Sequence, residues 1–229
     1  ASKEDEQAME ESSREDRCKV SVEMTRHFRE EIPRVVDELV LSCRRTDCFD
    51  HVGPEPIPSR EYVIEIIHRI QRLLYPGYFI RTRLDEVNLS YYFGQEATAL
   101  YENLSEQITL ALRHDCIRHD LPCIQCEERG QEAAINFMRE LPMLRGILGT
   151  DVRAAYTGDP AAAGYDEIIF SYPGLFAVTV YRAAHELYEQ RVPLIPRIMT
   201  EYAHTMTGID IHPGARIGDG AEVGPGSAV

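Results

Sequence analysis

The chain has 229 residues, of which 44% are apolar, and it carries a formal net charge of −14. This length suits one large domain or two small ones. The acidic balance argues against nucleic acid and anionic membranes as partners, because phosphates attract basic patches. No window reaches the roughly 18 consecutive apolar residues of a membrane span. The six Cys residues come with no sign of secretion, so we expect reduced thiols and a cytoplasmic protein.

Residues 1–17 are strongly acidic and contain no apolar core. They therefore resemble neither a secretory signal nor an Arg-rich transit peptide, and we expect a solvated, disordered tail. Since residue 1 is Ala, a targeting segment upstream of it stays an open alternative.

Helical periodicity dominates residues 18–207, which we predict to form an all-α domain, because apolar residues recur there at three- and four-residue spacings. The clearest apolar face follows Ser59, a residue suited to the N-cap, and ends before Pro76. Pro33 is expected to kink or divide the first helix. The predicted helices cover residues 20–42, 59–74, 90–113, 130–139, 141–148, 173–190 and 196–206.

The pattern changes at residue 209. Ile211, Ile217, Val223 and Val229 recur every six residues, and glycines directly follow two of them. A period of six with a β-branched residue each time is typical of a parallel β-helix. We therefore expect residues 208–229 to begin such a helix. Three hexapeptides make only about one coil, which cannot bury its inner face alone, so we expect this coil to be incomplete or to need other support.

Two motifs connect these segments to a known family. The first is Asp159-Pro160-Ala161, and the second is Tyr181-Arg182-x-x-His185-x-Leu187, followed by TEYAHTMTGIDIHPGARIG over residues 200–218. Together they resemble the bacterial-type serine O-acetyltransferases of the hexapeptide-repeat acyltransferase family, with a likeness covering about residues 85–220. The resemblance implies a mainly α chain, with an all-α N-terminal domain followed by the first coil of a left-handed parallel β-helix.

The resemblance also implies an activity, the transfer of acetyl from acetyl-CoA to the L-serine hydroxyl in cysteine biosynthesis. Asp210 matches the carboxylate that pairs with the family's catalytic His, and Asp159 matches one that binds the serine ammonium. The plainer alternatives are a turn residue capping the coil and an Asp-Pro turn residue. Acetyl-CoA is then a co-substrate, with no permanently bound cofactor and no metal, and the residues that hold it are not identified.

By the same resemblance we expect a homo-oligomer, a trimer or hexamer, and a cysteine synthase partner that docks on a C-terminal tail absent here. One departure is serious: Gly224 and Pro225 stand where the family has Asp-His, the pair that supplies the catalytic base. We therefore expect the chain as given to be inactive alone. The alternative function is a catalytically inactive, truncated homologue that acts as an oligomerisation or regulatory partner.

Several other groups of side chains are candidate sites. His114, Cys116, His119, Cys123 and Cys126 have a spacing that suits zinc or redox chemistry, but single buried or exposed side chains after a long helix are the simpler interpretation. His212 is interpreted as a structural hydrogen-bonding residue. Arg182 and His185 lie one turn apart on a predicted helix and face either a subunit interface or solvent.

Overall fold

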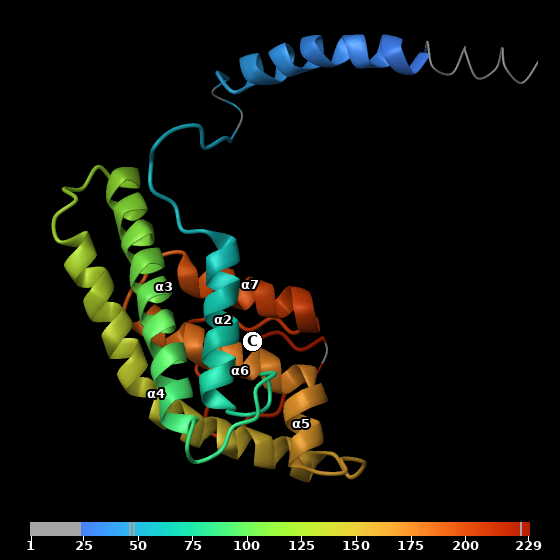
Figure 1. Cartoon of the computed structure of the whole chain (residues 1–229), viewed down its shortest axis with the longest axis vertical. Helices are drawn as coiled ribbons and strands as arrows, with labels where there is room; N and C mark the ends of the chain where they lie inside the picture. Colours follow the sequence, from blue (N-terminus) through green and yellow to red (C-terminus); the bar gives the residue numbers. More distant parts are fainter. Residues whose placement is uncertain (1–23, 46, 48, 225) are drawn as a thin grey trace, which may run out of the picture. The chain divides into compact units, whose positions relative to one another are not determined.

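The computed structural model of the chain describes residues 24–45, 47, 49–224 and 226–229 (Figure 1). The predicted acidic tail, residues 1–17, lies outside this part of the chain. The chain divides into two compact units, residues 1–55 and residues 56–229.

In the first unit, residues 24–42 form one continuous helix, so Pro33 does not divide it. The apolar stripe predicted from the periodicity is present on this helix. Its side chains are all about half exposed or more, and they comprise Met24, Phe28, Ile32, Val35, Val36, Leu39, Val40 and Leu41. Within the described residues of this unit, the stripe is therefore not covered.

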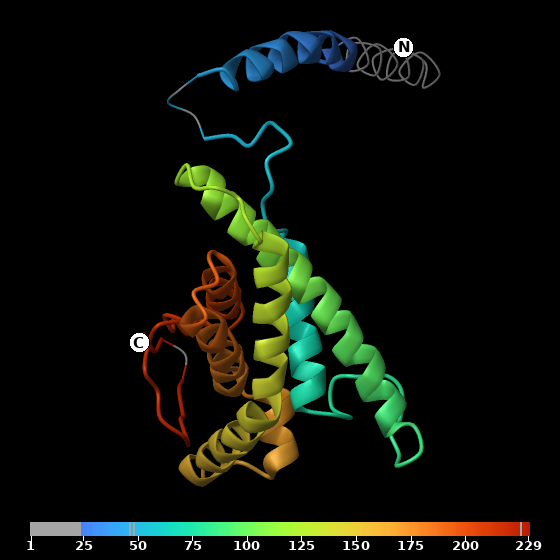
Figure 2. The same cartoon turned by 90° about the vertical axis from the view of Figure 1, so that its left-hand side faces the viewer.

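In its described residues, the second unit is built from six helices. They are α2 (Arg60–Leu74), α3 (Leu89–Arg118), α4 (Cys126–Gly158), α5 (Tyr165–Ser171), α6 (Pro173–Glu189) and α7 (Ile195–Thr207). The long helices α3 and α4 pack together, α2 lies against α3, and α6 packs against α7 (Figures 1 and 2). No helix in the described part of the chain is both long and apolar enough to cross a bilayer.

The predicted face of α2 is confirmed. Ser59 caps the helix by accepting a hydrogen bond from the Tyr62 N–H, which satisfies one of the free donors of the first turn. The face that it begins is buried, and consists of Val63, Ile66, Ile67, Ile70, Leu73 and Leu74. These side chains join one core with buried residues of α3, α4, α6 and α7. The unit is therefore held by one continuous apolar core.

The two short helices predicted over 130–139 and 141–148 are one helix, α4. It contains Pro142, which lacks an N–H donor and crowds the carbonyl four residues earlier. Figure 2 shows α4 changing direction along its length, and a proline inside a helix is a known cause of such kinks. The helix thus reaches past the core, and its C-terminal end at Gly158 brings the Asp159 motif close to α5 and α6.

The prediction of a left-handed β-helix coil at residues 208–229 is wrong. Among the described residues there is no strand, and the segment after α7 forms only one isolated parallel bridge, between Asp210 and Ala228. Three of the four periodic aliphatic residues pack on the helical core instead: Ile211 is buried, and Ile217 and Val223 lie against the same cluster. Val229, the fourth, is exposed. A single coil offers no neighbouring coil to pair with, so the α-helices supply the covering surface instead.

Three polar side chains of α6 hold this C-terminal segment, residues 208–229. The Tyr181 hydroxyl donates to the Ala215 carbonyl at 2.7 Å, and the Ile217 N–H donates to the same hydroxyl at 3.2 Å. His185 Nδ1 lies 2.7 Å from the Pro213 carbonyl oxygen. Arg182 donates to the Gly218 carbonyl at 2.8 Å. The Tyr-Arg-x-x-His motif therefore satisfies the backbone of an irregular segment that would otherwise bury unpaired carbonyls.

A buried ion pair supports the contact between α6 and the C-terminal segment. Arg182 Nε and Nη2 donate to the two oxygens of Asp151 on α4, at 2.7 and 2.8 Å. The two side chains are only 6% and 1% exposed. Asp151 also accepts the Ala221 N–H at 2.7 Å. Both charges are thus paired, and one bidentate contact joins α4, α6 and the C-terminal segment.

Asp151→Asn should lower the free energy of unfolding by about 3–5 kcal/mol, because it leaves the Arg182 guanidinium buried without its counter-charge. Urea unfolding measures the difference. The matched control is Glu201→Gln, which breaks the half-exposed pair of Arg197 and Glu201 and should change stability by less than about 1 kcal/mol. Equal, small losses in both variants would contradict an anchoring role for the buried pair.

Candidate functional site

Asp159 follows the last residue of α4, where its N–H donates to the Ala155 carbonyl. Its Oδ1 accepts the Ala161 N–H at 2.9 Å, which closes an Asx turn over Pro160. Its Oδ2 accepts the Tyr172 hydroxyl at 2.5 Å. These two donors, the tyrosine first, lower the pKa of the Asp159 carboxyl below its ordinary value. Asp159 is therefore a fixed and ionised carboxylate, as its proposed role requires.

Tyr172 belongs to an acidic environment. Its hydrogen bond to Asp159, with smaller effects of burial and of the Asp159, Glu167 and Glu222 charges, raises its pKa to about 12. Tyr172 is thus a neutral donor at ordinary pH. Glu222 comes from the C-terminal segment, and its carboxylate lies so close to Gly158 that a Cβ there would be 2.0 Å from an oxygen. The Asp159 carboxylate therefore contacts this tyrosine directly, and the charges of Glu167 and Glu222 act on it more weakly.

The path of the C-terminal segment depends on another glycine. A Cβ atom at Gly174, at the start of α6, would lie 2.1 Å from the Val223 carbonyl oxygen. That oxygen belongs to the backbone and cannot turn away, so only glycine permits the approach. The close contact places Glu222, the residue before Val223, beside the end of α4. We call the group of Asp159, Tyr172 and Glu222 the Asp159 corner.

Asp210 lies elsewhere on the same segment, at the isolated bridge. Its N–H donates to the Ser227 carbonyl, and its carbonyl accepts the Val229 N–H, each at 2.9 Å. The side chain is half-buried. Within the described residues no hydrogen bond reaches its carboxylate, and none joins it to Asp159. The structure thus places the two predicted carboxylates on one structural unit without bringing them into contact.

The histidines take structural positions. His212 is exposed, its Nδ1 accepts the Gly214 N–H at 3.0 Å, and its ring lies edge-on to Tyr188. This agrees with its interpretation as a structural residue. His185 and Arg182 contact the C-terminal segment of the same chain, so Arg182 does not face solvent. His204 is exposed on α7.

Three residues of this region were missed by the sequence analysis: Asp151, Tyr172 and Glu222. A signal existed for Asp151, since it falls on the same helical face as the buried residues Leu148 and Ala155. A charged residue at a core position calls for a buried partner. No comparable signal marks Tyr172 or Glu222, because their contacts depend on how distant segments meet.

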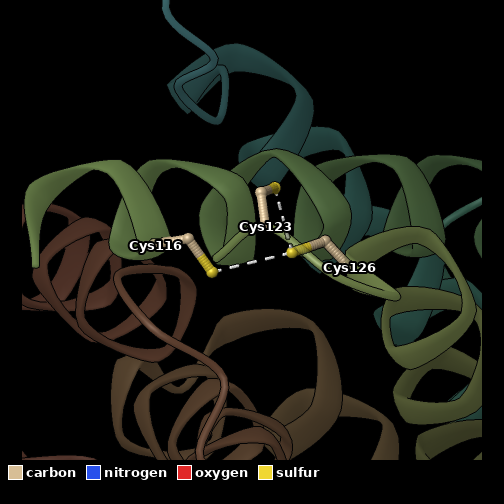
Figure 3. A group of neighbouring side chains, drawn as sticks. All are labelled: Cys116, Cys123 and Cys126. Carbon is tan, nitrogen blue, oxygen red and sulfur yellow. Dashed lines mark hydrogen bonds between the residues drawn. The ribbon is translucent and has the colours of Figure 1, made fainter. Parts of the chain in front are cut away.

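Three of the cysteines singled out from the sequence do come together. The sulfur atoms of Cys116, Cys123 and Cys126 all lie within 4.8 Å of one another, and Figure 3 shows the Cys126 sulfur in contact with each of the other two. Burial, with the two neighbouring thiols, raises the pKa of Cys126 to about 12. His114 and His119 do not belong to this group in the described part of the chain.

One surface groove lies apart from the predicted carboxylates. It has a volume of about 520 Å³, and neither Asp159 nor Asp210 lines it. Its walls are aromatic and aliphatic, with two cations, Arg145 and Arg153. The groove therefore gives no support to either predicted site residue.

Tyr172→Phe should raise the pKa of Asp159 toward its ordinary value, because the variant loses the stronger of the two donors to the carboxylate. The depressed pKa means that Asp159 favours folding above its unfolded-state pKa, and that this contribution is lost as pH falls through the folded-state value. In the variant, the folded-state pKa lies closer to the unfolded-state value, so the contribution is smaller and its loss is complete at a higher pH. A carbon-13 NMR titration of the carboxyl group measures the shift. Tyr165→Phe, which removes no donor to Asp159, is the control, and an unshifted titration in Tyr172→Phe would contradict the assignment.

Comparison with known proteins places the chain. No family model matches it. It is 37% identical over 177 residues to a plasmid-encoded serine acetyltransferase of Synechococcus elongatus, an alignment that covers 76% of this chain and 56% of that protein. The chain thus spans little more than half the length of this relative.

Solved structures agree. The native serine acetyltransferase 1 of Entamoeba histolytica matches with a TM-score of 0.55 and 30% identity, over 75% of this chain and 56% of the other. The same enzyme in complex with L-cysteine matches with a TM-score of 0.54 and 28% identity, over 78% and 59% of the two chains. From these likenesses in sequence and in structure, it follows that the chain belongs to the serine acetyltransferase family.

Proposed function

We propose that this protein is a serine O-acetyltransferase, which transfers acetyl from acetyl-CoA to the hydroxyl of L-serine, and that Asp159 binds the ammonium group of the acceptor. The observation that carries the proposal is the state of the Asp159 carboxylate. It is fixed by two donors, Ala161 N–H and Tyr172 O–H. A carboxylate has about four lone-pair sites, so this one keeps acceptor capacity for an ammonium group.

The surroundings of Asp159 favour a cation. Glu167 and Glu222 both add negative charge near Tyr172, and opposite charges within a few ångströms attract. One of the similar structures is a complex with L-cysteine, an amino acid with the same ammonium and carboxylate groups as serine. These facts support an α-amino acid as the ligand of this corner.

The reaction also needs groups that act on the hydroxyl. A base must take the serine proton while the oxygen attacks the thioester carbonyl, the C–S bond breaks, and the CoA sulfur leaves as a thiolate that is then protonated. We propose that Asp210 orients the histidine that acts as base. Because Gly224 and Pro225 stand where the family has Asp-His, we assign that histidine to no residue of this chain.

The proposal extends to the setting of the protein. We infer a cytoplasmic homo-oligomer that uses acetyl-CoA as a co-substrate, with cysteine synthase as a partner. The resemblance to the family supports these statements. The proposed role of Asp159 does not depend on these statements about location, assembly and partners.

Asp159→Asn should raise the Michaelis constant for L-serine about tenfold or more and leave that for acetyl-CoA nearly unchanged. A charge-assisted hydrogen bond contributes roughly 1.5–3 kcal/mol, and 1.4 kcal/mol corresponds to a factor of ten. Activity is measured as the fall in the thioester absorbance of acetyl-CoA, using a version of the protein that is shown to acetylate L-serine. L-alanine, which lacks the hydroxyl, should give no product.

The matched control is Asp166→Asn. Asp166 also accepts a tyrosine hydroxyl, that of Tyr78, at 2.5 Å, but lies outside the Asp159 turn. Asp166→Asn should leave the Michaelis constant for L-serine unchanged. A folded Asp159→Asn protein with the original serine dependence would make Asp159 an ordinary turn residue. Failure of the unaltered, folded protein to acetylate L-serine in every form tested would remove the proposed activity itself.

Asp210→Asn should lower kcat by more than about tenfold while changing the Michaelis constant for serine little. The amide cannot stabilise the imidazolium that forms when the base takes the serine proton. Asp219→Asn, an exposed aspartate on the same segment, is the control. An unchanged kcat would reduce Asp210 to a residue of the backbone bridge.

A further inference from the structure

We propose that Cys116, Cys123 and Cys126 form a binding site for a thiophilic transition-metal ion, with zinc as the representative ion, at the turn between α3 and α4. The site is separate from the Asp159 corner and does not depend on the proposed acetyltransferase activity. It is assembled entirely within the second unit of the chain.

The distances between the sulfur atoms fit this use. Cys126 Sγ lies 3.7 Å from Cys116 Sγ and 3.3 Å from Cys123 Sγ, and all three atoms fall within 4.8 Å of one another. Zinc–sulfur bonds of about 2.3 Å at tetrahedral angles hold sulfur atoms about 3.8 Å apart. Shifts of well under 1 Å in the two measured distances would therefore reach metal-binding geometry.

The three thiols come from three different local structures. Cys116 lies in the last turn of α3, Cys126 is the first residue of α4, and Cys123 belongs to the link between them. The link is held by a hydrogen bond from the Leu121 N–H to the Cys116 carbonyl, at 2.8 Å. Two of the three ligand positions are therefore held at helix ends, and the third lies in a short link between them, which favours a defined site.

The backbone of the link is unusual. Asp120 and Gln125 have φ angles of 52° and 59°, a left-handed conformation that is unfavourable for a non-glycine residue. The two residues flank Cys123 in sequence. Their conformation turns the chain so that the Cys123 sulfur approaches the other two. The sequence thus accepts local strain at the place where the three sulfurs meet.

Access and coordination number are also compatible with a metal. Cys116 and Cys126 are buried, whereas Cys123 is exposed, so an ion has a route from solvent. Three sulfurs leave a fourth tetrahedral position, for which a water molecule suffices. The neighbouring histidines are not required.

The competing use of the cluster is a disulfide. An S–S bond of about 2.05 Å would need Cys123 and Cys126 to approach by more than 1 Å from their 3.3 Å separation. It would also use two sulfurs and leave the third without a role. The closeness of all three sulfurs, within 4.8 Å of one another, therefore favours the metal site, and the disulfide becomes an outcome of the test.

The test uses the full chain, reduced and freed of metal. Zinc is titrated in competition with a chromophoric chelator, and cobalt is added separately to give an absorption spectrum. We expect one equivalent of zinc to bind and cobalt to show the thiolate charge-transfer and visible bands of a tetrahedral site. Cys126→Ser should weaken zinc binding by more than about 100-fold, beyond the loss expected for an outer-shell partner.

Cys123→Ser provides a second variant, because its side chain is exposed and the change should leave folding intact even where Cys126→Ser does not. The matched control is Cys43→Ser, which changes an exposed thiol in the first unit and should bind zinc normally. The proposal is overturned if the reduced chain takes up no zinc. Zinc uptake that survives Cys123→Ser, or a disulfide in the cluster with no zinc uptake by the reduced form, would overturn it as well.

Discussion

The buried pair of Asp151 and Arg182 is the contact on which the arrangement of the second unit depends. A guanidinium and a carboxylate removed from water are tolerated only when each is paired and its remaining hydrogen-bonding capacity is used. Here the remaining capacity is used by the C-terminal segment, through the Gly218 carbonyl and the Ala221 N–H. The charges on α4 and α6 therefore fix the path of a segment that has no regular secondary structure of its own.

The same path builds the candidate site. Ala221 is followed directly by Glu222, whose carboxylate lies against Gly158, and by Val223, whose carbonyl needs the space left by Gly174. The corner around Asp159 thus contains one charge from the end of α4 and another from a segment more than 60 residues later. An acidic corner assembled in this way disappears if the segment detaches. The acidic surroundings of Asp159 and the anchoring of the segment are therefore linked through backbone contacts.

The sequence was informative where local chemistry decides the structure. The face of α2, its cap at Ser59 and the turn at Asp159 all follow from the spacing of apolar residues and from the side chains of single residues. It was uninformative for Tyr172 and Glu222, since their positions result from contacts between distant segments. Asp151 stands between these cases, because its place on an apolar face signalled a buried partner without identifying Arg182.

The error at residues 208–229 has a specific physical cause. A six-residue period states which side chains need to be buried, Ile211, Ile217 and Val223 among them, but it does not state what buries them. In a stacked solenoid the neighbouring coils do so. Here the helical core does so, and Tyr181, Arg182 and His185 satisfy the backbone carbonyls that a sheet would otherwise pair. The Tyr-Arg-x-x-His motif thus has a direct structural role in this chain. Its side chains, on one face of α6, replace the backbone hydrogen bonds that neighbouring strands of a sheet would make.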